Sequence, residues 1–268
     1  MNPFFQLSTR ERARFHSEGY LIVPQLFSGE EVVAIQRITE LVLRDDPSRI
    51  DRHDADGLTT KLSLRNSIRD DVYGATVRCE RVAKTAEALL EAEVYHYHHK
   101  VMVKEQFVGG AWEWHQDYGY WYENGCLRPD MLSCMIAITA ANSANGCVDV
   151  VPGSHKLGRL EHVAVNDQVV ADPARVEVAI DRYKSVPCEL DAGDGVFFHC
   201  NLLHRSMSNQ SSQPRLSLIN CYNTRDNDPF IAHHHPQYSR LSVVEDAEVL
   251  RAADRQLAAL LGEDFNEG

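Results

Sequence analysis

Two kinds of hydrophobic pattern divide the chain. The first third shows apolar residues three and four positions apart, which is typical of amphipathic helices. The segment that begins at Ser8 carries Glu11 three residues later and ends at Gly19, so it has both a capping box and a C-terminal stop signal. Ser28 and Glu31 repeat this start signal. The predicted helices span residues 8–19, 28–44, 74–91 and 243–262.

From about residue 93 the period changes to two, which indicates β-strands. In 93–104, strict alternation places His96, His98 and Lys100 on one face and His99 on the other. Gly-, Pro- and Asn-containing turn signals separate the later apolar runs. The predicted strands are 20–24, 93–104, 131–139, 147–151, 186–190, 195–200 and 215–223.

Helices followed by many short strands predict a mainly β fold with flanking α-helices, a double-stranded β-helix (a cupin-like jelly roll). We expect one domain over 1–268, because no linker or repeat interrupts the chain. Its expected parts are a helical segment 1–92, a jelly-roll core at about 93–225 and a C-terminal cap and helix 226–268. The polar segment 45–71 is interpreted as a loop and a candidate lid, and 155–184 as an insertion.

Composition narrows the class of protein. A hydrophobic fraction of 44% allows a sizeable core, and a net charge of −12 argues against nucleic acid or an anionic membrane as the main partner. No apolar run reaches the ~20 residues of a membrane-spanning helix. The first residues lack the pattern of a signal peptide, and the seven cysteines form no CxxC pair, so we expect reduced thiols and a cytoplasmic location.

The stretch around His115 carries the candidate chemistry. In an extended chain His115 and Asp117 point to the same side, and one His with one carboxylate makes two-thirds of a facial Fe(II) triad. The missing histidine is expected in 195–206, where His204 and His199 are candidates. His204 fits better, because Arg215 follows eleven residues later and two antiparallel strands would place it beside His204. A guanidinium there would bind the far carboxylate of a chelating 2-oxoacid.

These motifs resemble the phytanoyl-CoA dioxygenase family, which includes ectoine hydroxylase. The matching residues are Trp114-His115-Gln116-Asp117, Val151-Pro152-Gly153-Ser154-His155, His204-Arg205-Ser206 and Arg215. The resemblance covers about residues 10–240 and implies an oxygenase that uses Fe(II), 2-oxoglutarate and O₂. It implies His115, Asp117 and His204 as metal ligands. It implies 2-oxoglutarate binding by Arg215 with Ser206, and places Lys100 and Ser133 on strands that line the same cavity.

The substrate side departs from the ectoine hydroxylase pattern at His98, Met102, Tyr118 and Gly119, which favours another small organic substrate. Asp117 favours hydroxylation over halogenation. The candidate substrate contacts are His98, Met102, Tyr118, Trp121 and His234. Three consecutive histidines, 233–235, are not expected to converge on one ion, and this segment is interpreted as a cap over the pocket mouth.

Two alternatives remain open from the sequence. One is a jelly-roll metalloenzyme that does not need 2-oxoglutarate, in which Arg215 would be structural. The other is a non-catalytic metal-binding sensor. The sequence does not indicate the oligomeric state.

Overall fold

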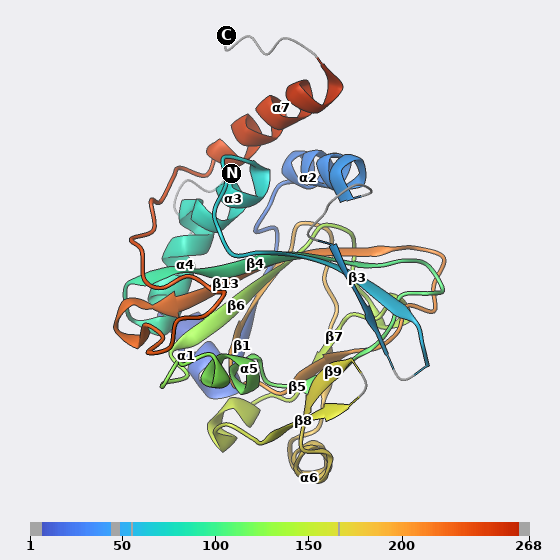
Figure 1. Ribbon diagram of the computed structural model, residues 1–268, viewed down its shortest axis with the longest axis vertical. Helices are drawn as coiled ribbons and strands as arrows, with labels where there is room; N and C mark the ends of the chain where they lie inside the picture. Colours follow the sequence, from blue (N-terminus) through green and yellow to red (C-terminus); the bar gives the residue numbers. More distant parts are fainter. Residues whose placement is uncertain (1–6, 44–48, 55, 166, 263–268) are drawn as a thin grey trace.

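Two facing antiparallel sheets form the centre of the computed structural model, which describes residues 7–43, 49–54, 56–165 and 167–262 (Figure 1). The larger sheet has seven strands, in the spatial order β1 (Tyr20–Val23), β11 (Gly195–His199), β6 (Met131–Ala137), β13 (Arg215–Thr224), β4 (Val94–Lys104), β3 (Thr59–Arg65) and β2 (Arg49–His53). The smaller sheet has the order β10 (Val186–Cys188), β7 (Val148–Val150), β12 (His204–Ser206) and β5 (Trp112–His115). The predicted jelly roll is confirmed.

Most helices cover the outer face of the larger sheet (Figure 1). They are α1 (Thr9–Glu18), α2 (Gly29–Val42), α3 (Val72–Arg78), α4 (Glu80–Leu90) and α7 (Glu248–Leu261). Both predicted capping boxes are confirmed, at Ser8 and at Ser28, and Gly19 ends α1 in the left-handed conformation with φ 84°. Two further helices are α5 (Asp117–Glu123) and α6 (Pro173–Tyr183), and short 3₁₀ turns span Ser143–Asn145, Ser154–Leu157 and Arg225–Asn227.

Three apolar clusters hold these layers together. The first joins the outer helices to the back of the larger sheet, with Phe15, Ile38 and Val82 packed near Leu218. The second fills the space between the sheets, and the third packs Trp114 of β5 against Val176 of α6. The space between the sheets therefore has apolar walls, and polar side chains in it are exceptions that need an explanation.

The helix predicted over 74–91 is two helices. The chain leaves helical geometry at Cys79, with ψ 144°, and α4 starts again at Glu80. The amide of Glu80 donates to the carbonyl of Val244 at 3.0 Å, so the segment before α7 supplies the partner that an uninterrupted helix would have provided.

The loop interpretation of 45–71 is wrong for Arg49–His53 and Thr59–Arg65, although residues 44–48 and 55 lie outside the described part. The strands β2 and β3 form a hairpin that extends the larger sheet beside β4. Asp56-Gly57 marks the turn, and Gly57 adopts a positive φ of 78°. Leu62 of β3 is buried, so this segment forms part of a wall.

The alternation predicted for 93–104 fails at one position. The partner strand β13 pairs Cys221 with His98 and Tyr222 with His96, which leaves Tyr97 as an extra residue in β4. This bulge puts His96 on the same side as His99, and their rings share a 2.9 Å hydrogen bond. Lys100 and Met102 line the inter-sheet cavity beside His115.

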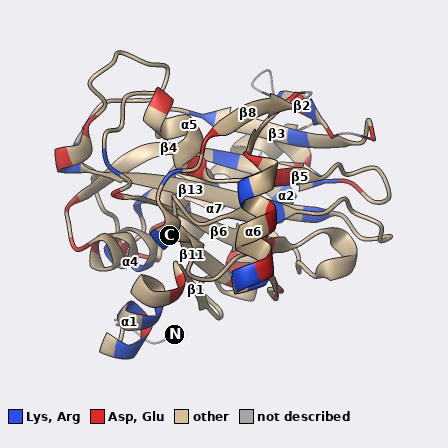
Figure 2. Cartoon of the chain, turned by 90° about the horizontal axis from the view of Figure 1, so that it is seen from below, with Lys and Arg blue, Asp and Glu red and all other residues tan. Residues whose placement is uncertain are grey.

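The 155–184 segment has its own structure. It contains the hairpin of β8 (His162–Val165) and β9 (Gln168–Ala171), followed by α6, which covers the outer side of the smaller sheet. Acidic and basic positions are interspersed along α6 (Figure 2). No helix among the described residues is long and apolar enough to cross a membrane.

The buried ion pair between α2 and α4 provides a stability prediction. Arg81 Nη2 donates to Glu31 Oε1 at 2.6 Å, and the exposed fractions are 8% and 2%. Glu31→Ala would remove this buried pair, leaving Arg81 only the more distant Asp246 at 4.0 Å, and would also open the capping box on Ser28. We therefore expect it to lower the free energy of unfolding by about 3–5 kcal/mol. The neighbouring Glu30 is exposed. Urea denaturation should show a change within about 0.5 kcal/mol for Glu30→Ala, and equal effects of the two variants would contradict this interpretation.

Candidate active site

His115 and His204 lie directly opposite each other where β5 pairs with β12. Their ring centroids are 4.1 Å apart, and both side chains are buried. The structure thus brings together the two predicted histidine ligands from distant parts of the chain. Opposed residues of an antiparallel pair lie close enough for their side chains to converge on one point.

Asp117 completes the cluster, but from a different element than expected. It is the first residue of α5, which begins directly after β5, and the chain is not extended through it. Its Oδ1 lies 3.8 Å from His115 Nε2 and 4.0 Å from His204 Nε2. One donor atom of each of the three residues lies within 4.8 Å of the others. Its Oδ2 accepts a 2.8 Å hydrogen bond from Ser133 Oγ on β6.

The hydrogen bonds of the two histidines orient their free nitrogens. His115 Nδ1 donates to the carbonyl of Glu113 at 2.7 Å, and His204 Nδ1 donates to the carbonyl of Leu202 at 2.9 Å. A carbonyl only accepts, so each Nε2 keeps its lone pair, and both point toward Asp117. Burial lowers the pKa of both imidazoles, which favours the neutral form that binds metal. This donor set fits a divalent iron ion.

Arg215 reaches the same cavity from the opposite sheet. It begins β13, which pairs with β4 and β6, whereas β12 pairs with β5 and β7. The prediction that the strands of His204 and Arg215 are adjacent is therefore wrong, because residues 207–214 cross between the sheets. Arg215 nevertheless lines the inter-sheet cavity together with His204 and Ser206.

The electrostatics of Arg215 point to an anion. The side chain is 1% exposed and donates through Nη1 to the carbonyl of Gly146, while its Nε has no hydrogen-bond partner among the described residues. No acidic partner of Arg215 occurs in the described part of the chain. Burial lowers its pKa to about 10, so it remains charged at neutral pH. The nearby Lys104 donates to the carbonyls of Ser206 and Met207.

The cavity has two ends that meet at the candidate metal ligands His115 and Asp117. The end that contains Arg215, Ser206 and Met102 is narrow and lies deep between the sheets. The other end is a cavity of about 330 Å³ that includes His115 and Asp117. Lys100 and Trp112 line both ends. Met102, predicted as a substrate contact, therefore lies at the arginine end.

The wider end contains most of the other predicted substrate contacts. His98, Trp121 and His234 line it, together with His235 and Tyr120. Tyr118 lies elsewhere: its hydroxyl donates to the carbonyl of Cys126 at 3.1 Å, and its ring packs on Tyr122. Ser133, predicted to bind 2-oxoglutarate, instead donates to the carboxylate of Asp117 and does not line the narrow end that contains Arg215.

The other histidines considered from the sequence lie outside the triad. His199 accepts a hydrogen bond from the amide of Asn201, and His155 contacts the carbonyl of His16. His162 was missed by sequence reasoning: its Nε2 accepts from the amide of Gln116 at 3.0 Å and so holds the turn between the two ligands. Gln116 also donates to the carbonyls of Gly158 and Asn201. The only signal for Gln116 was its place inside the His-x-Asp motif.

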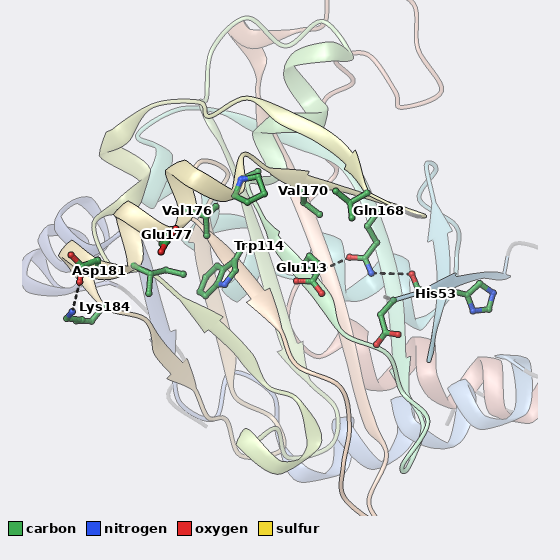
Figure 3. A pocket seen from close by; sticks show the side chains of 14 residues that line it. His53, Glu113, Trp114, Gln168, Val170, Val176, Glu177, Asp181 and Lys184 are labelled. Atoms are coloured by element: carbon green, nitrogen blue, oxygen red, sulfur yellow. Dashed lines mark hydrogen bonds and ion pairs between the residues drawn. The ribbon is translucent and has the colours of Figure 1, made fainter. Parts of the chain in front are cut away.

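A larger cavity of about 780 Å³ lies behind β5, on the side that faces α6 (Figure 3). Trp114 and Glu113 both point toward it, because β5 has one more residue than β12 between the pairs His115–His204 and Trp112–Ser206. The side-chain oxygen of Gln168 accepts a hydrogen bond from the backbone amide of Glu113. Its Nε2 donates to the carbonyl of His53 (Figure 3). This bulge turns Trp112 and His115 inward and places the two residues between them outside.

Comparisons with known proteins agree with this geometry. The phytanoyl-CoA dioxygenase family model matches residues 15–217. The ectoine dioxygenase of Bordetella parapertussis is 30% identical over 237 residues, which cover 82% of this chain and 77% of the relative. The L-proline trans-4-hydroxylase of Streptomyces griseoviridis is 28% identical over 81% of this chain and 87% of its own.

Solved structures show the same fold. EctD from S. alaskensis, with 2-oxoglutarate and 5-hydroxyectoine, superposes with a TM-score of 0.74 at 25% identity over 89% of this chain and 88% of its own. The carbocyclase SnoK has a TM-score of 0.68 at 22% identity over 88% of this chain and 95% of its own, a likeness of fold alone. This chain belongs to the phytanoyl-CoA dioxygenase family and is an iron- and 2-oxoglutarate-dependent dioxygenase.

Proposed function

We propose that this enzyme hydroxylates a C–H bond of a small organic molecule while 2-oxoglutarate is converted to succinate and CO₂. The observation that carries the proposal is the pairing, in one cavity, of a buried His-Asp-His donor set with a buried arginine that has no acidic partner among the described residues. We assign the metal to His115, Asp117 and His204, and the far carboxylate of 2-oxoglutarate to Arg215 with Ser206.

The protein's own residues would do three things in this reaction. When bound, iron(II) would supply open coordination positions for the 2-oxoacid and O₂ and pass electrons to O₂, two of them from the decarboxylating 2-oxoacid and two from the substrate C–H bond. Ser133 holds the outer oxygen of Asp117 so that Oδ1 remains available. Lys100, between the two ends of the cavity, adds positive charge toward the cosubstrate. Trp112 and Tyr120 close the site against water, which protects a reactive oxidant from side reactions.

The substrate is assigned to the wider end, against His98, Trp121 and His234. The relatives named for ectoine and L-proline support a small molecule as substrate. The carboxylate at position 117 supports hydroxylation, because it occupies a position that a halide would otherwise need. Family membership favours this function over a metalloenzyme independent of 2-oxoglutarate and over a non-catalytic sensor.

The triad can be tested spectroscopically. Anaerobic addition of Fe(II) and 2-oxoglutarate should give the weak visible charge-transfer band of the chelated complex, and His115→Ala or Asp117→Ala should abolish both the band and succinate formation. His199→Gln, at the rival histidine outside the cluster, is the matched control and should keep the band. Oxygen consumption that persists without 2-oxoglutarate would favour the cosubstrate-independent alternative. Metal binding with no succinate from any substrate would favour the sensor.

The arginine assignment is tested by separating cosubstrate binding from folding. A hydrogen bond to a charged group is worth about 1.5–3 kcal/mol, so Arg215→Gln should raise the KM for 2-oxoglutarate by about 10- to 100-fold. Arg215→Lys should restore little of this, because an ammonium cannot bind carboxylate through two parallel hydrogen bonds. In thermal denaturation with Fe(II) under anaerobic conditions, 2-oxoglutarate should stabilise the wild type and not Arg215→Gln. Equal stabilisation of both proteins would show that Arg215 is structural.

Ser133 is proposed as a positioning residue. Loss of an outer hydrogen bond to a metal ligand typically costs about 10- to 100-fold in metal affinity, so Ser133→Ala should raise the Kd for Fe(II) by that factor while the KM for 2-oxoglutarate changes little. Ser217 on the neighbouring strand β13 is also buried, and its hydroxyl has no partner in the described structure. Ser217→Ala is therefore the control and should leave iron affinity unchanged. A rise in the KM for 2-oxoglutarate alone would place Ser133 at the cosubstrate instead.

A further inference from the structure

The three consecutive histidines after β13 converge, contrary to the expectation from the sequence. One ring nitrogen from each of His233, His234 and His235 lies within 4.8 Å of the other two. The ring centroids are 3.8 Å apart for the first pair and 4.0 Å for the second. The chain bends at His234 and His235, so the side chains do not alternate as they would in a strand.

Two hydrogen bonds of this cluster fix which ring nitrogens are free. The amide of His235 donates to His233 Nδ1 at 3.5 Å. His235 Nδ1 lies 2.7 Å from the amide oxygen of Asn66, next to β3. That oxygen only accepts, so Nδ1 carries the proton and Nε2 is left free as a ligand.

The cluster lies on the wall of the cavity assigned to the substrate. His234 and His235 line the same cavity as His115 and Asp117. The His235 ring stacks on His98, with centroids 4.6 Å apart and planes 18° apart. His98 Nδ1 is buried without a hydrogen-bond partner in the described structure, so this wall already contains one unsatisfied polar atom.

We propose that His233, His234 and His235 form a second site for a divalent transition metal, separate from the iron site. Three imidazoles with one open position suit Zn²⁺ or a similar borderline ion. A bound ion would cross-link the segment after β13 to itself and, through His235 and Asn66, to the end of β3. It would thereby fix one wall of the substrate cavity. The proposal rests on the histidine geometry and does not depend on the roles assigned to Arg215 or to the iron ligands.

Zinc stoichiometry provides the test. Tag-free wild-type protein, equilibrated with Zn²⁺ by dialysis and analysed for metal, should bind about two ions per chain, since zinc also occupies His-rich iron sites. The double variant His233→Gln/His234→Gln should bind about one, as should His115→Ala/Asp117→Ala, and the combined variant none. His16 and His53 are exposed and lie outside both clusters, so His16→Gln/His53→Gln is the control and should still bind two.

The outcomes separate the two sites. Unchanged zinc binding in His233→Gln/His234→Gln, or one ion in the wild type that only the triad variant removes, would overturn the second site and leave the proposed function intact. If only His233→Gln/His234→Gln lost zinc and His115→Ala/Asp117→Ala did not, the second site would be supported and zinc binding by the triad would not. Asn66→Ala gives a further readout: removal of the residue that holds His235 should weaken zinc at this site by about 10- to 100-fold and leave Fe(II) affinity unchanged.

Discussion

The pairing of β5 with β12 is the constraint on which the active site depends. It sets His115 opposite His204 and joins both to the smaller sheet, so their separation follows from the register of two short strands. In each ring Nδ1 donates a hydrogen bond to the backbone carbonyl two residues earlier in the sequence. Backbone geometry therefore determines both the position and the tautomer of the ligands. Asp117 joins them because β5 ends at His115 and a helix begins two residues later.

The buried Arg215 places an unpaired positive charge in the same cavity. An ion held between apolar walls without a counter-charge is costly, and natural structures rarely keep one without a use. Arg215 is 1% exposed, and Lys104 beside it is 0% exposed, with burial and the neighbouring guanidinium lowering its pKa. The guanidinium of Arg215 thus lies where no described acid pairs with it, while Lys104 beside it donates to the carbonyls of Ser206 and Met207. Under the proposed function, a dicarboxylate cosubstrate would supply the missing charge and a partner for the free Nε of Arg215.

Sequence reasoning identified seven of the described strands, including β4, β6 and β13, and the Ser-x-x-Glu helix starts, because each depends on local chemistry. It missed the short strands β5 and β12 that carry His115 and His204, and it grouped these two histidines with Asp117 and Arg215 from motif and spacing alone. It failed where tertiary contacts decide. Nothing local shows that Cys79 interrupts a helix whose next amide pairs with Val244, or that residues 207–214 cross between sheets. The β2–β3 hairpin had an available signal, Asp56-Gly57, but its polar outer strand resembles a loop. The extra residues in β4 and β5 are visible only from their partners.

The two ends of the cavity differ in the side chains that β4 and β5 place in them. In β5 the bulge turns Trp112 and His115 inward together. In β4 regular alternation keeps His98, Lys100 and Met102 on the cavity side, while the bulge at Tyr97 turns His96 to the opposite side. The deep end is lined by Arg215 and Lys100, which under the proposed function would bind the dianionic cosubstrate. The wide end collects imidazoles and Trp121, and burial lowers the pKa of His98 and His235, so these rings stay neutral. Under the proposed function, selection at this end would combine stacking and hydrogen bonds to these rings with the charges of Arg52, Lys100 and Asp167, which line the same cavity.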